Sequence, residues 1–307
     1  MAINMARDII KKISELLIHI EDNNDLKNVV HSLEGFSGKK IIATLQGITK
    51  ILCEDSVYLE IGVFRGLTLL SNAFENKKVP CCGIDNFSLF DAERNNRRII
   101  ETNINQLGLS NVNIIDRDYE DALGSLTDYI GAKKVGVFFV DGPHDYRSQL
   151  VSLLWIVPHL ADNCAIIIDD ANYSHVRQAT NDFLRTFPDF ALIAEAYTPK
   201  HPANMNDEEK RNALNGWWNG INIIVRDPER LISRKLAKED NKKLHFASHD
   251  IFRHEFADVA FDIMRLAQLA KFDELKKLIA KHKSDYPEFF EHQNTFSDSL
   301  TRFVVYS

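Results

Sequence analysis

The chain has 307 residues, of which 45% are hydrophobic and 26% charged, and its formal net charge is −7. This composition is typical of a globular protein, and the acidic balance argues against a nucleic-acid or anionic-membrane partner, because both favour a basic surface. The stretch 1–23 carries charges throughout and lacks the apolar centre of a signal peptide, and no apolar run is long enough to cross a bilayer. We therefore expect a cytoplasmic protein with buried thiols at Cys53, Cys81, Cys82 and Cys164.

The chain begins with predicted helices. Apolar residues recur at helical spacing in 3–21, and further helix is predicted in 25–33 and 39–52. From residue 57 onward, short apolar strands alternate with helices. The predicted strands are 57–62, 79–85, 112–116, 135–141, 164–169, 190–197 and 221–227. The predicted helices between them cover 67–76, 92–108, about 146–157 and about 176–187.

This alternation predicts an α/β fold. Strands that are apolar on both faces and alternate with helices are typical of a mostly parallel sheet with helices on both faces. We expect three parts: an N-terminal helical segment (1–52), a central α/β domain (53–227) and a C-terminal helical extension (228–307). The polar stretch 198–220 is predicted to be a loop or short helix inserted between the last two strands.

Glycines and acids occur where the first two strands end. The first strand leads into "EIGVFRG", which contains Glu60, Gly62 and Gly66, and the second ends in Asp85. Gly62 allows a tight turn, and Gly66 allows a ligand to approach the start of the next helix. An acid at Asp85 suits the two hydroxyls of a ribose, so the pattern indicates a nucleoside ligand. An NAD-dependent oxidoreductase is disfavoured, because the middle glycine of GxGxxG and a second nucleotide half are missing.

Three carboxylates occur at the ends of two further strands. Asp141 ends the apolar run in "VGVFFVDGPHDY", and Asp169 and Asp170 end the one in "CAIIIDDANY". In open parallel sheets the ligand lies outside the carboxyl ends of the strands, where these side chains are expected. Each aspartate alone is also compatible with a structural role, as the cap of a turn or of the following helix.

These motifs together resemble a known family. The segments "YLEIGVFRG", "CCGIDNF", "VFFVDGPHDY" and "AIIIDDANYSHVRQATNDF" are similar to class I S-adenosylmethionine (SAM) methyltransferases, and most similar to the metal-dependent, macrocin-type sugar O-methyltransferases. The resemblance covers about 57–187 and implies a Rossmann-like, mostly parallel seven-stranded sheet with helical N- and C-terminal extensions. It places Glu60, Gly62 and Gly66 around the methionine part of SAM, Arg65 at its carboxylate, Asp85 at the ribose and Asp118 near the adenine.

The resemblance also implies a metal site beside the cofactor. Asp141, Asp169 and Asp170 would bind a divalent ion, most simply Mg²⁺, since a hard cation relieves the repulsion between carboxylates. Asp141 would thereby also border the cofactor. Many macrocin-type enzymes have an acid two residues after this first ligand, whereas this chain has Pro143. His144 is therefore the candidate general base, with a loop histidine that only supports the metal site as the alternative.

The implied function is that of a SAM-dependent, metal-assisted O-methyltransferase. Its acceptor would be a hydroxyl of a sugar or another small polyhydroxylated natural product, and a catechol-like acceptor would fit the same metal geometry. The alternative is a non-catalytic SAM- or metal-binding interaction module. Such a module is expected to lose a carboxylate or the glycine turn, and this chain keeps both. The helical extensions would cover the site or form a homo-oligomer, and Trp217 and Trp218 would either line a ring-binding wall or anchor the insertion.

Overall fold

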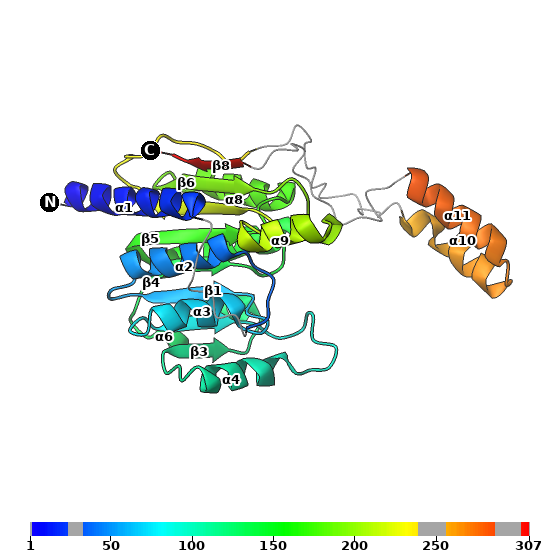
Figure 1. Cartoon of the computed structure of the whole chain (residues 1–307), viewed down its shortest axis with the longest axis horizontal. Helices are drawn as coiled ribbons and strands as arrows, with labels where there is room; N and C mark the ends of the chain where they lie inside the picture. The colour runs from blue at the N-terminus through cyan, green and yellow to red at the C-terminus, as the bar shows by residue number, and fades with distance from the viewer. Residues whose placement is uncertain (1, 24–32, 239–255, 286–301, 307) are drawn as a thin grey trace.

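A single mixed sheet forms the centre of the molecule (Figure 1). The computed structural model describes residues 2–23, 33–238, 256–285 and 302–306, so the helix predicted in 25–33 lies almost entirely outside the described residues. The order in the sheet is β3-β2-β1-β4-β5-β7-β6-β8. The strands are β1 (Val57–Ile61), β2 (Cys81–Ile84), β3 (Val112–Ile115), β4 (Val135–Val140), β5 (Leu160–Asp169), β6 (Phe190–Tyr197), β7 (Ile221–Arg226) and β8 (Arg302–Val305).

The strand directions confirm the predicted Rossmann-like fold. Strands β1 to β5 are parallel, and β7 is inserted antiparallel between β5 and β6. The chain builds β2 and β3 on one side of β1 and then returns to place β4 on its other side. The carboxyl ends of β1 and β4 therefore form the switch point at which α/β sheets bind ligands. The eighth strand, β8, pairs antiparallel with β6 at the edge of the sheet and was not predicted from the sequence.

Helices cover both faces of the sheet because its strands are apolar on both faces. In β4, Phe138 and Phe139 are both fully buried and face opposite sides, so each belongs to a different hydrophobic core. One core is formed with α1 (Ala2–Asp22), α2 (Lys39–Leu52), α3 (Leu67–Glu75) and α4 (Asn96–Gln106). The other is formed with α5 (Tyr119–Gly124), α6 (Thr127–Ile130), α7 (Tyr146–Ile156) and α8 (Ser174–Thr186). The four cysteines are buried free thiols, as predicted.

The insertion between β6 and β7 contains two short helical elements, η2 (Pro202–Asn204) and α9 (Asp207–Asn215). Another 3-10 helix, η1 (Val157–His159), joins α7 to β5. Trp217 is 3% exposed, its ring stacks on Phe303 of β8 at 5.5 Å, and its Nε1 donates to Glu21 of α1 at 2.7 Å. Trp217 thus anchors the insertion to both ends of the chain, whereas Trp218 lines the cavity described below.

The C-terminal part departs from the prediction of helix from residue 228 onward. Residues 228–238 form no helix and run as irregular chain, because Pro228 follows β7 and Asp227 accepts the amides of Leu231 and Ile232 in a turn. Helix is present in α10 (Phe256–Gln268) and α11 (Phe272–Asp285), which pair with each other.

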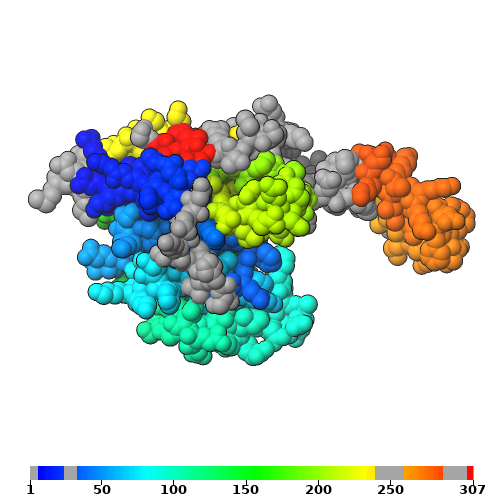
Figure 2. All heavy atoms as spheres, viewed as in Figure 1, coloured from blue at the N-terminus to red at the C-terminus, as the bar shows by residue number. Residues whose placement is uncertain are grey.

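Helices α10 and α11 stand apart from the sheet body in Figure 2 and expose several apolar side chains. These are Met264, Leu269, Phe272 and Ile279. The described residues contain no helix that is both long and apolar enough to cross a membrane. The boundaries of the three parts and a homo-oligomer formed through the extensions stay predictions.

Candidate active site

A cavity of about 820 Å³ opens at the carboxyl ends of the parallel strands. Its size lies within the range of small-molecule sites, ~300–1,000 Å³. Several residues singled out from the sequence line it: Gly62, Asp85, Asp118, Asp141, His144 and Asp170. Four other residues singled out from the sequence are not among those that line the cavity: Glu60, Arg65, Gly66 and Asp169.

The turn after β1 needs glycine at Gly62. Its φ is +85°, and a Cβ atom there would lie 1.8 Å from the carbonyl oxygen of Asp141. Gly62 therefore lets the end of β1 approach the end of β4, where the first carboxylate begins. Gly66, with φ +92°, forms the left-handed start of α3. Both glycines serve backbone geometry, as predicted, and their predicted proximity to a cofactor stays a prediction.

Asp85 ties the first two strand ends together. Its Oδ2 accepts the backbone N–H groups of Val63 and Phe64, both at 2.8 Å, and its Oδ1 accepts that of Phe87 at 2.7 Å. These bonds fix the glycine turn relative to the loop after β2. Because a carboxylate has about four acceptor positions, Asp85 retains capacity for further donors from the cavity, such as ribose hydroxyls.

Glu60 lies one layer behind the cavity wall. It is fully buried and accepts hydrogen bonds from the hydroxyls of Tyr58 and Thr68. Burial raises the pKa of its carboxyl group to about 8, although these two hydroxyls act in the opposite direction. Thr68 itself lines the cavity, and its hydrogen bond to Glu60 fixes the direction of its hydroxyl in the cavity wall. The sequence analysis did not predict a role for Thr68. The one indication in the sequence is that Thr68 lies in the first turn of the helix after Gly66.

Arg65 does not line the cavity itself but contacts residues that do. It forms an ion pair with Glu34, donates to Asn96 at 2.9 Å and lies over the ring of Phe64. Its predicted contact with a cofactor carboxylate would require it to leave Glu34. The aromatic residues here were also missed: Phe64 packs with Phe36 at 5.3 Å and with Phe90 at 6.5 Å, and all three line the cavity.

Asp118 caps the helix after β3. Its side chain accepts the backbone N–H of Glu120 at 2.9 Å and lies 3.5 Å from the amide nitrogen of Asn86. Asp118 and its neighbours Arg117 and Tyr119 line the end of the cavity nearest β2 and β3. This aspartate therefore lines the same cavity as Asp85, and its proximity to an adenine stays a prediction.

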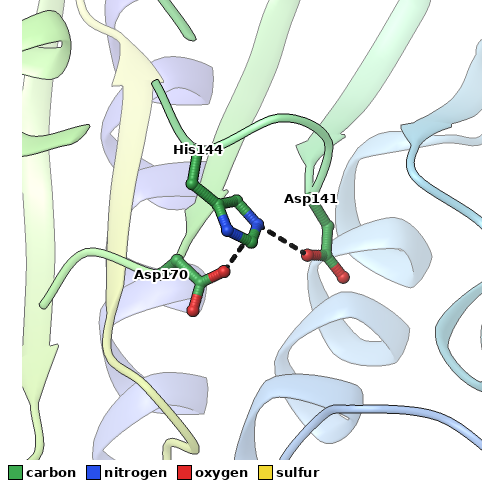
Figure 3. A group of neighbouring side chains, drawn as sticks. All are labelled: Asp141, His144 and Asp170. Atoms are coloured by element: carbon green, nitrogen blue, oxygen red, sulfur yellow. Dashed lines mark ion pairs between the residues drawn. The ribbon is translucent and has the colours of Figure 1, made fainter. Parts of the chain in front are cut away.

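Asp141, His144 and Asp170 converge on one point (Figure 3). One ligand atom from each lies within 4.8 Å of the others. His144 Nε2 lies 2.7 Å from Asp170 Oδ2 and 3.9 Å from Asp141 Oδ1. Asp169 lies outside this triplet, and its Oδ1 is buried with no hydrogen-bond partner among the described residues. The sequence predicted the three aspartates as ligands and His144 as a base, whereas the geometry places His144 in the triplet itself.

The charges of this cluster perturb one another. Burial, followed by the charges of Asp141 and Asp170, raises the pKa of Asp169 well above its ordinary value. Burial likewise raises the pKa of Asp141 to about 6. Burial alone would lower the pKa of His144, but Asp170 and Asp141 outweigh it and raise that pKa well above its ordinary value. Burial also opposes ionisation of Asp170, yet His144 and Asn219 outweigh it and lower its pKa.

These perturbations mean that the negative charge of the cluster needs compensation, by protons, by His144 or by a bound cation. Three carboxyl groups meet at the ends of β4 and β5, those of Asp169 and Asp170 buried and that of Asp141 partly exposed, and Asp169 Oδ1 has no donor among the described residues. Carboxylate oxygens suit Mg²⁺, and an imidazole nitrogen is also acceptable to Mn²⁺ and similar ions. The side chains present therefore fit a divalent ion.

Aromatic rings border the cluster on its other side. Tyr173 lies at the centre, with ring centroids 5.9 Å from His144, 5.2 Å from His175 and 5.7 Å from His201. Tyr173, His201 and Trp218 line the cavity. This wall is built mainly by the loop after β5 and the insertion 198–220, so a molecule bound against it would lie beside the carboxylates.

A family model matches the central part of the chain. Residues 59–171 match the family model of a methyltransferase domain. The match spans most of β1 through β5 and confirms the resemblance to methyltransferases that the motifs indicated. None of the curated proteins compared with the chain matches it significantly.

Solved structures show a distant likeness. An O-methyltransferase from Bacillus cereus in complex with SAH is 15% identical, with a TM-score of 0.47, over 69% of this chain and 91% of that one. The O-methyltransferase TomG from Streptomyces achromogenes, involved in tomaymycin synthesis and solved with SAM, is 15% identical, with a TM-score of 0.45, over 71% and 89%. A putative caffeoyl-CoA O-methyltransferase from Staphylococcus aureus is 14% identical, with a TM-score of 0.44, over 64% and 87%.

Proposed function

We propose that the chain is a SAM-dependent, divalent-metal-assisted O-methyltransferase that acts on a hydroxyl of a sugar or another small polyhydroxylated molecule. The observation that carries this proposal is the position of the Asp141–His144–Asp170 cluster. It opens into the same cavity as the Gly62 turn and Asp85. A nucleoside cofactor and a cation-binding cluster are thus expected to share one cavity at the switch point of the sheet.

The cofactor would occupy the end of the cavity near β1, β2 and β3. Asp85 is placed to accept ribose hydroxyls, and Asp118 lies beside it at the adenine end. Gly62 leaves room for the methionine part, and the hydroxyl of Thr68 offers a polar contact there. These placements support the roles predicted from the sequence for Gly62, Asp85 and Asp118.

The cation would be held by oxygens of Asp141, Asp169 and Asp170, with His144 at its edge. When bound, it would hold two adjacent acceptor oxygens, ease the loss of one hydroxyl proton and offset the carboxylate charge that keeps His144 protonated. His144 Nε2 is then the atom proposed to accept the hydroxyl proton. In the structure Nε2 lies 2.7 Å from Asp170 Oδ2 and so donates to it, which means that Nε2 could accept the hydroxyl proton only after it had given up its own proton and this contact.

The acceptor would lie against the aromatic wall formed by Tyr173, His201 and Trp218. Flat apolar faces with polar edges suit a ring that carries hydroxyl groups, as in sugars and catechols. The cavity volume of about 820 Å³ lies in the upper part of the range for small-molecule sites, which would leave room for an acceptor beside the cofactor. A ring with two adjacent hydroxyls combines contact with the wall and chelation by the cluster.

Calorimetry with SAH, with and without Mg²⁺, tests this proposal. We expect micromolar SAH binding, on the order of −8 kcal/mol. We also expect Mg²⁺ uptake that is lost in Asp169→Asn and kept in Asp162→Asn. Asp162 is the matched control because it lies near the other end of the same strand and is fully exposed.

Each outcome has a distinct meaning. SAH binding without Mg²⁺ uptake would contradict the metal assistance and reduce the three aspartates to structural caps. The absence of SAH binding would contradict the methyltransferase proposal itself. Binding of both, without methyl transfer to any diol in an acceptor panel, would favour the non-catalytic module.

A further inference from the structure

We propose that Arg177 is the positioning residue that holds the Asp169–Asp170 pair in its cation-binding geometry. This inference rests on the proposed function, since it concerns the same cation site. The segment Asp169–Asn172 is called the aspartate loop below. It joins the end of β5 to α8, and Arg177 is in the first turns of that helix.

Arg177 is a buried charge aimed at the aspartate loop. It is 1% exposed, and its Nη1 donates to the carbonyl oxygens of Ala171 at 2.7 Å and Asn172 at 2.6 Å. Its Nε donates to the carbonyl oxygen of Lys238 at 2.7 Å, and the guanidinium lies over the ring of Tyr197. A buried guanidinium is costly unless its donors are satisfied, so these carbonyls and Arg177 hold each other in place.

The opposite side of the aspartate loop is held by the turn before β7. The amide of Ala171 donates to Gly220, and the amide of Asn172 donates to Asn219 at 3.0 Å. The side chain of Asn219 also donates to Asp170 Oδ1. The backbone of the aspartate loop is thus held by its N–H groups on one side and by its carbonyls on the Arg177 side.

Asp170 makes this support necessary. Its φ is +54°, a left-handed conformation that is unfavourable for a non-glycine residue. Such a conformation persists when the surrounding bonds determine it. In this conformation Asp170 Oδ2 faces His144. If the carbonyls of Ala171 and Asn172 lost Arg177, the aspartate loop could relax and the carboxylate of Asp170 would leave the cluster.

Arginine is needed at this position because its fork reaches three carbonyl oxygens from one plane. Lysine keeps the charge but presents a single nitrogen, so it cannot hold Ala171, Asn172 and Lys238 together. Arg177 also lies within "SHVRQATNDF", a stretch that carried the family resemblance without a role for its arginine. The contacts assign that role to the support of the aspartate loop.

The test compares Arg177→Gln and Arg177→Lys with Asn181→Ala. Asn181 lies one turn further along α8, is 1% exposed, and exchanges two hydrogen bonds with the backbone of Ala237. Asn181 therefore holds the 237–238 segment, as Arg177 does. These two bonds go to Ala237 and not to the aspartate loop. Asn181→Ala controls for a general loss of stability in this region.

The readouts are the Kd for Mn²⁺ by electron paramagnetic resonance and the Kd for SAH by calorimetry, with the full chain. We expect both Arg177 variants to raise the Mn²⁺ Kd about tenfold or more, as loss of outer-sphere support does in metal sites. The SAH Kd should stay unchanged. In the metal-free protein, the amides of Ala171 and Asn172 should exchange hydrogen faster in the Arg177 variants than in Asn181→Ala.

Two results would overturn the inference. One is an unchanged Mn²⁺ Kd in Arg177→Lys and Arg177→Gln, and the other is an equal rise in Asn181→Ala. A wild-type chain that binds SAH but no Mn²⁺ would contradict the metal part of the proposed function, and this inference with it. Mn²⁺ binding is therefore measured on the wild type first. If the wild type binds Mn²⁺, an unchanged Kd in the Arg177 variants contradicts this inference and leaves the proposed function standing.

Discussion

Replacement of Glu60 by glutamine should change how the stability of the protein depends on pH. Glu60 is fully buried, and burial raises the pKa of its carboxyl group from the ordinary 4.5 to about 8. Between these two values the unfolded chain has lost the proton while the folded chain keeps it. The unfolded state then binds fewer protons, so the free energy of unfolding falls as the pH rises.

The magnitude follows from the size of the shift. One pKa unit corresponds to ~1.4 kcal/mol, so Glu60 alone should lower the free energy of unfolding by about 3 kcal/mol between pH 5 and pH 7.5. A glutamine side chain at this position cannot ionise, and the hydroxyls of Tyr58 and Thr68 can turn to accept from its amide. The stability of Glu60→Gln relative to wild type should therefore rise by about 3 kcal/mol over this range.

Urea unfolding at several pH values between 5 and 7.5, without cofactor or metal, measures this difference. The contributions of other buried acids cancel because both proteins contain them. Glu101→Gln is the control, since Glu101 is exposed and pairs with Arg97 on the surface, and its difference from wild type should barely change with pH. A Glu60→Gln difference that stays constant or falls with rising pH would refute the reasoning.

Three further changes are predicted from the contacts. Gly62→Ala would place a Cβ atom 1.8 Å from the carbonyl oxygen of Asp141, so we expect a lower thermal midpoint and loss of SAH affinity by calorimetry; unchanged affinity would contradict the role of this turn. Asp85→Asn removes the charge that accepts two backbone amides of the glycine turn, so the SAH Kd should rise about tenfold, and an unchanged Kd would exclude a cofactor contact. Deletion of residues 302–307 removes β8 and uncovers Trp217, so urea unfolding should show a loss of about 2 kcal/mol while SAH binding persists; unaltered stability would mean that β8 contributes little.

The parallel core could be predicted from the sequence because its signals are local. Each strand from 57–62 to 164–169 is a short apolar run that ends in glycine or an acid, and each helix shows its own spacing. The structure places these elements within a few residues of the predicted bounds. The site residues Gly62, Asp85, Asp141 and Asp170 were predictable for the same reason, because strand ends in a parallel sheet meet at one edge.

The remaining elements depend on contacts between distant parts of the chain. β8 is four residues long and gains its strand conformation by pairing with β6, which no local pattern reveals. The segment 228–238 lacks helix because Asp227 and Asn181 bind its backbone amides. Thr68 and Arg177 look ordinary in the sequence, and only their contacts with Glu60 and with the aspartate loop show what they do.

One half of the cavity is built from elements with local sequence signals, and the other half depends on contacts between distant parts of the chain. This difference bears on substrate choice. The half proposed for the cofactor is built by the ends of β1, β2 and β3, and Asp85 holds the turn after β1 against the start of the loop after β2. The half proposed for the acceptor is built by His144 after β4, Tyr173 after β5 and Trp218 before β7, which come together only in the folded chain. Trp217 anchors that insertion to α1 and β8, so the far ends of the chain hold the acceptor wall in place. A change of acceptor is therefore expected to arise in 198–220 and its terminal supports, while the cofactor half stays the same.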